Sequence, residues 1–463
     1  MSNGALPSYL SMAKPNPAAN RAPWYKNTAP TYAGIFLWFV FWSAISSGGT
    51  AVPGGVLSQG IGVALLGVII AALLCHFLFY YVPGMFGLTT GLPLYVVGSA
   101  QYGTQGGFLM PGFLMGVLQF GWLGVNAYFS SLALAPLFGG SAAAAKVIAI
   151  VWAALAAFVG LKGIQYVAKV ATLLPLIPLI ILLILLVKTA GGISSFDAQK
   201  FVAAGTVASP GTAALSFWGV IALSITYIVG FFATAGAAGV DFGTNSRDTK
   251  DVQMGGLVGI ALATLVAGGA SVLIAAGAFS QTGHYALSTA DPGFMGRVMG
   301  SESVGKWMGL LLAVAAFPPA CFSSFIAANS FKTTLPTVNP FVSVGIGTAV
   351  SIILAVTGWA GQLASVFTVI GASFGPICGA MLVDYVLSGQ TWAGPRRGWN
   401  MAGWISWALG FLVGIAPLVK IADIPAAPLF AFIVGAVVYF VLAKAGLQPP
   451  VVEMAKAPAE GAS

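Results

Sequence analysis

Charge, cysteine and histidine are scarce in this sequence of 463 residues. Only 6% of the residues are Asp, Glu, Lys or Arg, whereas 58% are hydrophobic, and the mean hydropathy is +0.95. A soluble globular protein carries far more charge on its surface, so that class is excluded. Three cysteines and two histidines suggest neither a disulfide framework nor a metal-ligand cluster. The composition predicts a polytopic membrane protein.

Apolar runs of about 20 residues, the length that crosses a bilayer, recur along the chain. We predict twelve spans, at 31–58, 60–82, 106–133, 143–161, 166–188, 212–238, 253–279, 304–330, 340–357, 362–387, 402–419 and 425–444. Polar and proline-rich residues precede the first span, so we expect no cleavable signal peptide. Of the 18 Lys and Arg, 12 fall on the side of the two termini. This bias predicts a multi-pass protein of the cell's inner or plasma membrane with both termini in the cytoplasm.

Glycine and proline punctuate two of these spans. The first contains "SSGGTAVPGG", residues 46–55, and the sixth contains Gly230, Gly236 and Gly239. We expect both helices to break there at membrane depth and to free backbone carbonyls. Two broken helices in corresponding positions of two halves are typical of inverted-repeat secondary transporters, with the site at the breaks. The alternative is that these glycines only let neighbouring helices pack closely.

A polar and aromatic stripe lies on the third span. Gln119, Trp122 and Asn126 follow the spacing i, i+3 and i+7, so they share a helix face. A tryptophan near mid-span is too deep for the interfacial aromatic belt. Beside two carboxamides, it suits a flat ligand that forms hydrogen bonds. The alternative is a core tryptophan with carboxamides bonded to a neighbouring helix.

The eighth span carries hydroxyls and a carboxamide that must be satisfied within the membrane. Ala320, Ser323 and Ser324 share one face, and hard oxygen ligands of this kind suit a small hard cation. Asn329 lies about 140° around the helix from Ser324. We therefore expect one helix to border two adjacent sites.

Several motifs, in this order, resemble the nucleobase:cation symporter-1 family, which includes cytosine permeases and hydantoin and allantoin transporters. They are "SAISSGGTAVPGG", "MFGLTTGLPLYVV", "QFGWLGVNAYF", "VGFFATAGAAGVDF", "SSFIAANS" and "GASFGPICGAMLVDYVL". The resemblance implies an all-α, LeuT-like fold of two inverted five-helix repeats followed by two C-terminal helices. The repeats would occupy residues 31–190 and 200–390, the two extra helices 400–445, and the cytoplasmic tails 1–30 and 446–463.

The resemblance also implies a substrate site. Its candidate residues are Trp122, Phe232, Asn329, Asn126, Gln119, Gly48 and Phe231. Trp122 and Phe232 would sandwich a flat ring, and Asn329 would anchor its edge. Two positions depart from the family pattern: Gly48 stands where the hydantoin branch has glutamine, and Phe231 stands where cytosine permeases tend to have serine.

A sodium site is implied in the same way, from backbone oxygens of the first span and groups of the eighth. Its members would be Ala44, Ser47, Ala320, Ser323 and Ser324. No carboxylate relay is visible at mid-membrane, which favours sodium over proton coupling. Near the inner end of the tenth span, Asp384 is expected to pair with Arg396 or Arg397.

The sequence thus predicts a transporter rather than an enzyme. It would import a nucleobase or related planar heterocycle, with cytosine or a purine as first candidates, in symport with sodium by alternating access. The alternatives are proton coupling, or transport of an amino acid or organic cation by the same fold. The expected partners are the small-molecule substrate, sodium and the lipid bilayer. We expect no enzymatic cofactor, no nucleic acid and no obligate protein partner.

Overall fold

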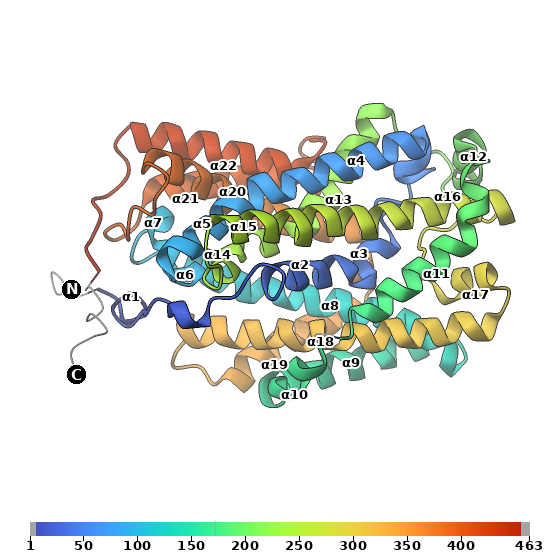
Figure 1. The fold of residues 1–463 in the computed structure, drawn as a ribbon, viewed down its shortest axis with the longest axis horizontal. Helices are drawn as coiled ribbons and strands as arrows, with labels where there is room; N and C mark the ends of the chain where they lie inside the picture. Colours follow the sequence, from blue (N-terminus) through green and yellow to red (C-terminus); the bar gives the residue numbers. More distant parts are fainter. Residues whose placement is uncertain (1–5, 172, 455–463) are drawn as a thin grey trace.

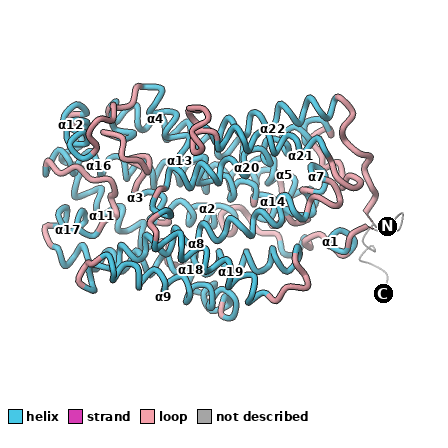
Figure 2. The backbone as a smooth tube through the Cα atoms, turned by 180° about the vertical axis from the view of Figure 1, so that it is seen from behind, coloured by secondary structure: helices cyan, strands magenta, loops and turns pink. Residues whose placement is uncertain are grey.

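Helices and connecting loops make up the chain in the computed structural model, which describes residues 6–171 and 173–454 (Figure 2). Nine helical segments in these residues are long and apolar enough to cross a membrane. They are Ile61–Thr90, Phe108–Phe138, Ala142–Lys162, Leu176–Ile193, Phe217–Ala237, Thr249–Thr282, Glu302–Thr334, Leu363–Leu387 and Ala427–Lys444. Two shorter apolar helices, Pro340–Val356 and Met401–Ile415, and a divided first span complete the twelve predicted crossings.

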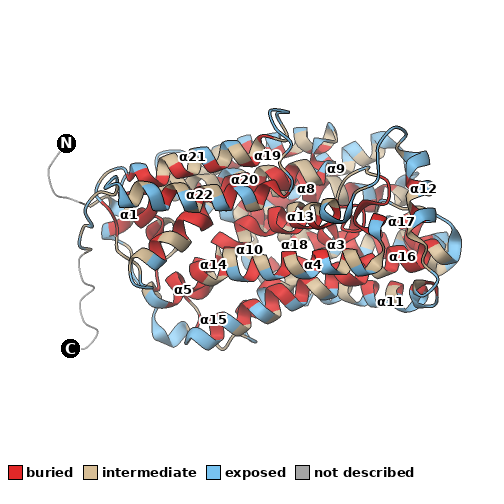
Figure 3. Ribbon diagram, turned by 90° about the horizontal axis from the view of Figure 1, so that it is seen from above, coloured by how far each residue is buried: buried red, intermediate tan, exposed pale blue. Residues whose placement is uncertain are grey.

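The helices pack as a bundle with their buried faces turned inward (Figures 1 and 3). In chain order the main elements are α2 (Thr28–Leu37), α3 (Phe39–Ser43), α4 (Ile61–Leu74), α5 (Tyr81–Thr90), α8 (Leu114–Leu134), α9 (Ala142–Lys162), α11 (Leu176–Ile193), α13 (Phe217–Ala237), α14 (Gly239–Gly243), α15 (Thr249–Gly256), α16 (Ala270–Thr282), α17 (Pro292–Met299), α18 (Glu302–Thr334), α19 (Pro340–Val356), α20 (Leu363–Leu387), α21 (Met401–Ile415) and α22 (Ala427–Lys444). Helix α13 packs against α4 and α20, and α18 packs against α8 and α9. The predicted boundaries of the two repeats and tails stay predictions.

The first span breaks earlier than its glycines suggest. Helix α2 ends at Leu37, Trp38 has an extended ψ of 123°, and the five-residue α3 follows. Residues 46–55 form no α-helix, so the helix is interrupted there as predicted, but the break at Trp38 comes first; Gly48, Gly49, Gly54 and Gly55 of this irregular connection have positive φ. Turns of this kind favour glycine, which lacks the Cβ that clashes at positive φ.

Hydrogen-bond donors from distant parts of the chain satisfy carbonyls of α3. The Tyr227 hydroxyl of α13 donates to the Val40 and Phe41 oxygens at 3.2 and 2.7 Å, and the Ser271 hydroxyl of α16 donates to the Trp42 oxygen. The backbone N–H of Thr289 donates to the Ser43 oxygen at 2.7 Å. Unpaired carbonyls at membrane depth cost several kcal/mol each, so these bonds let a short helix end inside the bundle.

The sixth span stays helical through its glycines, contrary to the predicted mid-span break. Helix α13 continues to Ala237, and the chain bends only at Ala238 before α14. A Cβ on Gly230 would clash with the Phe367 carbonyl of α20, and one on Gly236 would lie 2.8 Å from the Phe79 Cβ. These glycines therefore allow close helix packing, the alternative considered from the sequence.

A buried polar cluster surrounds Asp384, near the C-terminal end of α20. Asp384 is fully buried, and its carboxylate accepts hydrogen bonds from Arg396 at 3.1 Å, Tyr439 at 2.9 Å and Gln101 at 2.9 Å. Gln448, beyond α22, also lies 3.4 Å from this carboxylate. The predicted pairing of Asp384 with Arg396 is confirmed.

Candidate functional site

Four aromatic rings meet where the first span breaks. Trp122 of α8 makes edge contacts with Trp38 and with Phe231 of α13, at centroid distances of 5.9 and 5.3 Å. Phe367 of α20 lies 5.7 Å from Trp122 and 5.4 Å from Phe231. We call these four residues the aromatic cluster. Elements from both predicted repeats contribute to it.

The rings of the aromatic cluster touch one another in this structure. A flat ligand held between two parallel rings needs about 7 Å between them, twice the usual contact distance of about 3.5 Å. The Trp122 and Phe231 rings are 5.3 Å apart and nearly perpendicular, at 82°. A ring could therefore bind between them only after one side chain turns or its helix moves.

Polar groups with spare hydrogen-bonding capacity border the cluster. The indole nitrogen of Trp38 is buried and has no hydrogen-bond partner among the described residues. The indole N–H of Trp122 donates to the Thr234 hydroxyl at a long 3.4 Å. One turn away on α8, the amide nitrogen of the buried Gln119 contacts only the Met115 sulfur, at 3.6 Å. These groups could donate hydrogen bonds to a ligand with little loss of folding stability.

Two predicted substrate residues lie elsewhere. The fully buried Phe232 stacks on Phe36 of α2 at 5.5 Å, and Tyr32 lies 5.6 Å from it. The Asn126 amide donates to the Ala316 carbonyl of α18 at 2.9 Å, and its oxygen accepts from Trp152 at 3.0 Å. Phe231 thus takes the place expected of Phe232, and Asn126 joins three helices.

Asn329 has an exposed side chain on α18 for which the structure gives no hydrogen bond among the described residues. Its backbone oxygen already accepts a hydrogen bond from the Thr333 hydroxyl at 3.3 Å. The carboxamide is therefore the part of Asn329 that is available to a ligand. Ser330, the next residue, lies against Gly116 of α8, and its hydroxyl donates to the carbonyl of Gly112, just before α8 begins. The Asn329 carboxamide is therefore exposed and free to bind a ligand.

The first-span residues predicted to bind sodium already use their carbonyls. The Ala44 oxygen accepts from the Gly49 N–H at 3.0 Å and from the Ser47 hydroxyl at 2.9 Å. The Ser47 oxygen accepts from the Thr50 hydroxyl at 3.0 Å. Gly48, predicted to border the substrate, has φ +65° and lies against Leu223 near the start of α13. All three lie beyond the break, in the irregular connection.

The eighth-span candidates lie in a continuous helix. Helix α18 passes through Pro318 and Pro319 without losing helical geometry, and Ala320, Ser323 and Ser324 are buried. The Ser323 hydroxyl donates to the Pro319 carbonyl at 3.2 Å. The Ser324 hydroxyl has no partner among the described residues and lies against Gly160 of α9. An unpaired buried hydroxyl costs roughly 1–3 kcal/mol, which a bound cation would offset.

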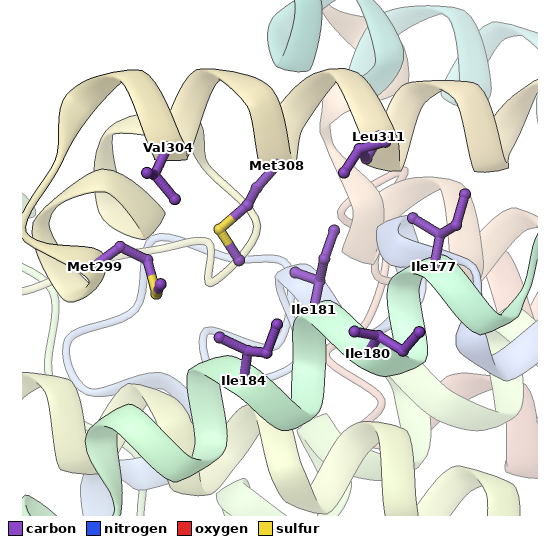
Figure 4. A pocket seen from close by; sticks show the side chains of 8 residues that line it. All are labelled: Ile177, Ile180, Ile181, Ile184, Met299, Val304, Met308 and Leu311. Atoms are coloured by element: carbon purple, nitrogen blue, oxygen red, sulfur yellow. The ribbon is translucent and has the colours of Figure 1, made fainter.

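A separate groove of about 260 Å³ lies between α11 and α18 (Figure 4). Its lining is entirely aliphatic or thioether, and includes Ile181, Met299 and Met308. It offers no hydrogen-bonding group to orient a polar substrate. The aromatic cluster is therefore the better candidate for the substrate site.

Sequence reasoning missed Trp38, Thr234 and Phe367. Trp38 lies only seven residues into the predicted first span, so it gave a weaker signal than Trp122, which lies near mid-span. Thr234 and Phe367 gave no comparable signal, since hydroxyl and phenyl groups are common in packed membrane helices.

A bundle of twelve crossings with a discontinuous first span, and with aromatic and amide groups at that discontinuity, has the architecture of a secondary transporter. Solved transporter structures share it. Mhp1, a nucleobase-cation-symport-1 family transporter in a closed conformation with bromovinylhydantoin bound, matches with a TM-score of 0.67 and 14% identity, over 96% of each chain.

Two further structures extend this comparison. Inward-facing Mhp1 gives a TM-score of 0.69 at 15% identity, over 98% of this chain and 97% of that one. A Na⁺-coupled sialic acid symporter gives 0.53 at 15% identity, over 94% and 92%. No protein-family model and no curated protein sequence matches the chain. The predicted fold, two inverted five-helix repeats with two C-terminal helices, is confirmed, and it is a transporter fold rather than an enzyme fold.

Proposed function

We propose that this protein is a symporter of the nucleobase:cation symporter-1 type that imports a nucleobase or related planar heterocycle, such as cytosine or a purine. The aromatic cluster at the helix break is the observation that carries the proposal. A flat ring stacked on Trp122 would gain about 0.5–1.5 kcal/mol per aromatic face. The unpartnered indole N–H of Trp38 supports this choice, because nucleobases and hydantoins present ring carbonyls that accept such a bond.

Amide side chains would form hydrogen bonds with the polar edge of the ring. The carboxamides of Asn329 and Gln119 each offer a donor and an acceptor, which match the adjacent carbonyl and N–H of a nucleobase or hydantoin. Both have free hydrogen-bonding capacity, since Asn329 is exposed and Gln119 contacts only a sulfur through its nitrogen. Asn126 has no such capacity for its oxygen, so we leave it out of the proposed site.

The coupling ion is proposed to be sodium, bound on the buried face of α18. Ser323, Ser324 and the Ala320 carbonyl would supply oxygen ligands, and carbonyls at the end of α2 would complete the site in place of Ala44 and Ser47. The unpartnered Ser324 hydroxyl supports this assignment. Orientation with both termini in the cytoplasm is part of the proposal and rests on the distribution of Lys and Arg.

Uptake into proteoliposomes tests the function. We expect saturable uptake of a radiolabelled nucleobase that shows counterflow and requires sodium. Thermal unfolding of the purified protein against a panel of nucleobases, hydantoins and aromatic amino acids identifies the substrate, because a ligand stabilises by RT ln(1 + [L]/Kd). Stabilisation by amino acids alone would overturn the substrate class, and uptake that follows a proton gradient in potassium buffer would overturn sodium coupling.

Two variants distinguish the proposed substrate site from the proposed sodium site. Asn329→Ala should weaken substrate binding about 5- to 150-fold, since ligand groups are left unpaired at roughly 1–3 kcal/mol. Its sodium affinity without substrate should stay unchanged. The Ser323→Ala, Ser324→Ala double variant should do the reverse. If Asn329→Ala weakens sodium and spares substrate, the two faces of α18 are assigned the wrong way round.

A further inference from the structure

A second pocket lies between the second and seventh spans, apart from the aromatic cluster. It has a volume of about 230 Å³ and is lined by His76, Phe77, Tyr81, Gln253 and Leu257. Two π-helical turns face each other here, Cys75–Tyr80 in the second span and Leu257–Leu262 in the seventh. Such turns occur often at functional sites, because they displace side chains from the regular helical position.

The inner wall of this pocket holds an unsatisfied histidine. His76 is 1% exposed, and its Nδ1 has no hydrogen-bond partner among the described residues. Gly256 lies directly against the imidazole, where a Cβ would clash with Nδ1. The glycine thus makes room for the ring. A buried polar atom without a partner costs roughly 1–3 kcal/mol, so a ligand that bonds the imidazole would be favoured.

The outer wall opens toward the bilayer. Phe77 is 54% exposed and Leu257 is 37% exposed, on helices that cross the membrane. Gln253 is exposed beside them. A ligand would therefore enter sideways from the lipid, with its chain against Phe77 and Leu257.

A cation lies on the same helix face toward the membrane surface. Lys250, Gln253 and Leu257 follow i, i+3 and i+7 and so share one face of the seventh span. Lys250 is exposed in the first turn of α15 and forms no ion pair within the described part of the chain. Its neighbour Arg247 is held by Asp251 at 2.7 Å. Lys250 is thus available to an anion at the membrane surface.

We propose that this pocket binds an anionic phospholipid from the leaflet at the N-terminal end of α15. Lys250 contacts the phosphate, while Gln253, Tyr81 and His76 donate hydrogen bonds to the glycerol ester oxygens. The match is chemical, because the ester region of a phospholipid offers acceptors without donors and all three side chains can donate. The groove between α11 and α18 has no polar lining and therefore cannot select a headgroup in this way.

Native mass spectrometry of the full-length protein tests this proposal, with phosphatidylglycerol and phosphatidylcholine of identical chains as probes. The wild type should retain phosphatidylglycerol in preference to phosphatidylcholine. Lys250→Gln should lower that preference on the order of fivefold, the effect of one cation at a membrane surface. Gln253→Leu should lower retention of both lipids. Lys146→Gln, an exposed lysine at the start of α9, is the matched control and should behave as the wild type.

Equal retention of the two lipids by the wild type would overturn the proposal. So would an unchanged preference in Lys250→Gln, provided that its unfolding temperature equals that of the wild type. His76→Leu adds a second check, because it removes the imidazole donors at nearly constant volume and should reduce retention without altering headgroup preference. The readout needs no substrate, so its outcome is independent of the proposed transport function.

Discussion

The first and sixth spans carry the same glycine-rich signal, and the structure uses it in two ways. In the first span, the helix breaks at Trp38, before the glycines of residues 46–55, and those glycines form the connection beyond α3. In the sixth span, Gly230 and Gly236 lie inside a continuous helix, against α20 and the second span. Glycine permits both outcomes. What decides between them is whether neighbouring groups satisfy the carbonyls that a break exposes.

Tyr227 joins these two regions. It belongs to the unbroken α13, and its hydroxyl bonds two carbonyls of the broken first span. The continuous helix thus supplies a partner that the discontinuous one needs. The comparison predicts that substitutions at the break impair binding, whereas substitutions at the packed glycines impair stability.

The largest effect is expected at the break itself. Trp38→Ala removes a ring that contacts Trp122 and Phe231 together with an unpartnered indole N–H. Substrate affinity, measured by calorimetry, should fall about 5- to 150-fold, from roughly 1–3 kcal/mol of lost stacking and hydrogen bonding. Trp38→Phe keeps an aromatic ring, so it should retain the stacking part of the affinity and lose only the hydrogen bond. Trp218→Ala, at an exposed tryptophan of α13, is the control. Equal losses in the alanine and phenylalanine variants would reduce the role of the Trp38 ring to helix packing.

A stability defect is expected from the sixth span. Gly230→Ala forces a methyl group against the Phe367 carbonyl, and overpacking of this kind costs about 1–3 kcal/mol. Thermal unfolding in detergent should show the loss, while the folded fraction should bind substrate with nearly normal affinity. Normal stability combined with lost binding would mean that α13 unwinds at Gly230 during transport, as a mid-span break would require.

A smaller loss should follow removal of the link between the two spans. Tyr227→Phe keeps the ring and deletes the hydroxyl that serves Val40 and Phe41. We expect destabilisation of roughly 1–3 kcal/mol, toward the lower end because the Val40 oxygen still accepts a hydrogen bond from the Ser43 hydroxyl at 3.2 Å. Hydrogen exchange should rise selectively in α3. A uniform rise over the whole bundle would contradict a local role for this hydroxyl.

The smallest effect is expected at glycines with open space. Gly62 of α4 and Gly121 of α8 lie within helices, and a Cβ added at either position would have no neighbouring atom within 4 Å. Alanine at either position should change the unfolding free energy by less than about 1 kcal/mol, in the stabilising direction, because alanine favours helix. Marked destabilisation at either site would show that glycine is required there for a reason other than close contact between helices.

Periodicity along single helices predicted much of this molecule. The apolar runs gave all twelve crossings, and two of the predicted substrate residues, Trp122 and Phe231, contact each other, although the predicted pair was Trp122 and Phe232. The choice of Phe232 could not be checked from the sequence, since neighbouring residues point about 100° apart and a small rotation of α13 decides which ring faces α8. Asn126 shares a face with Trp122, but α18 covers its edge of that face.

The position of the break was not predictable because it depends on residues far apart in the chain. Tyr227, Ser271 and Thr289 follow α3 by more than 180 residues, and each supplies a hydrogen bond to it. No pattern within residues 28–60 reports their presence. The predicted sodium ligands of the first span, Ala44 and Ser47, were chosen next to the glycines and lie beyond the break at Trp38; their role as ligands stays a prediction.

The Asp384 cluster can form in full only after residues far downstream of α20 have been synthesised. When the ribosome has made α20, Gln101 is already present, but Tyr439 and Gln448 are still 55 and 64 residues away. A nascent chain that stops before Tyr439 therefore presents a buried carboxylate with part of its hydrogen bonds missing. We expect the membrane quality-control machinery to degrade such a chain, although at least ten of the twelve predicted spans are already made.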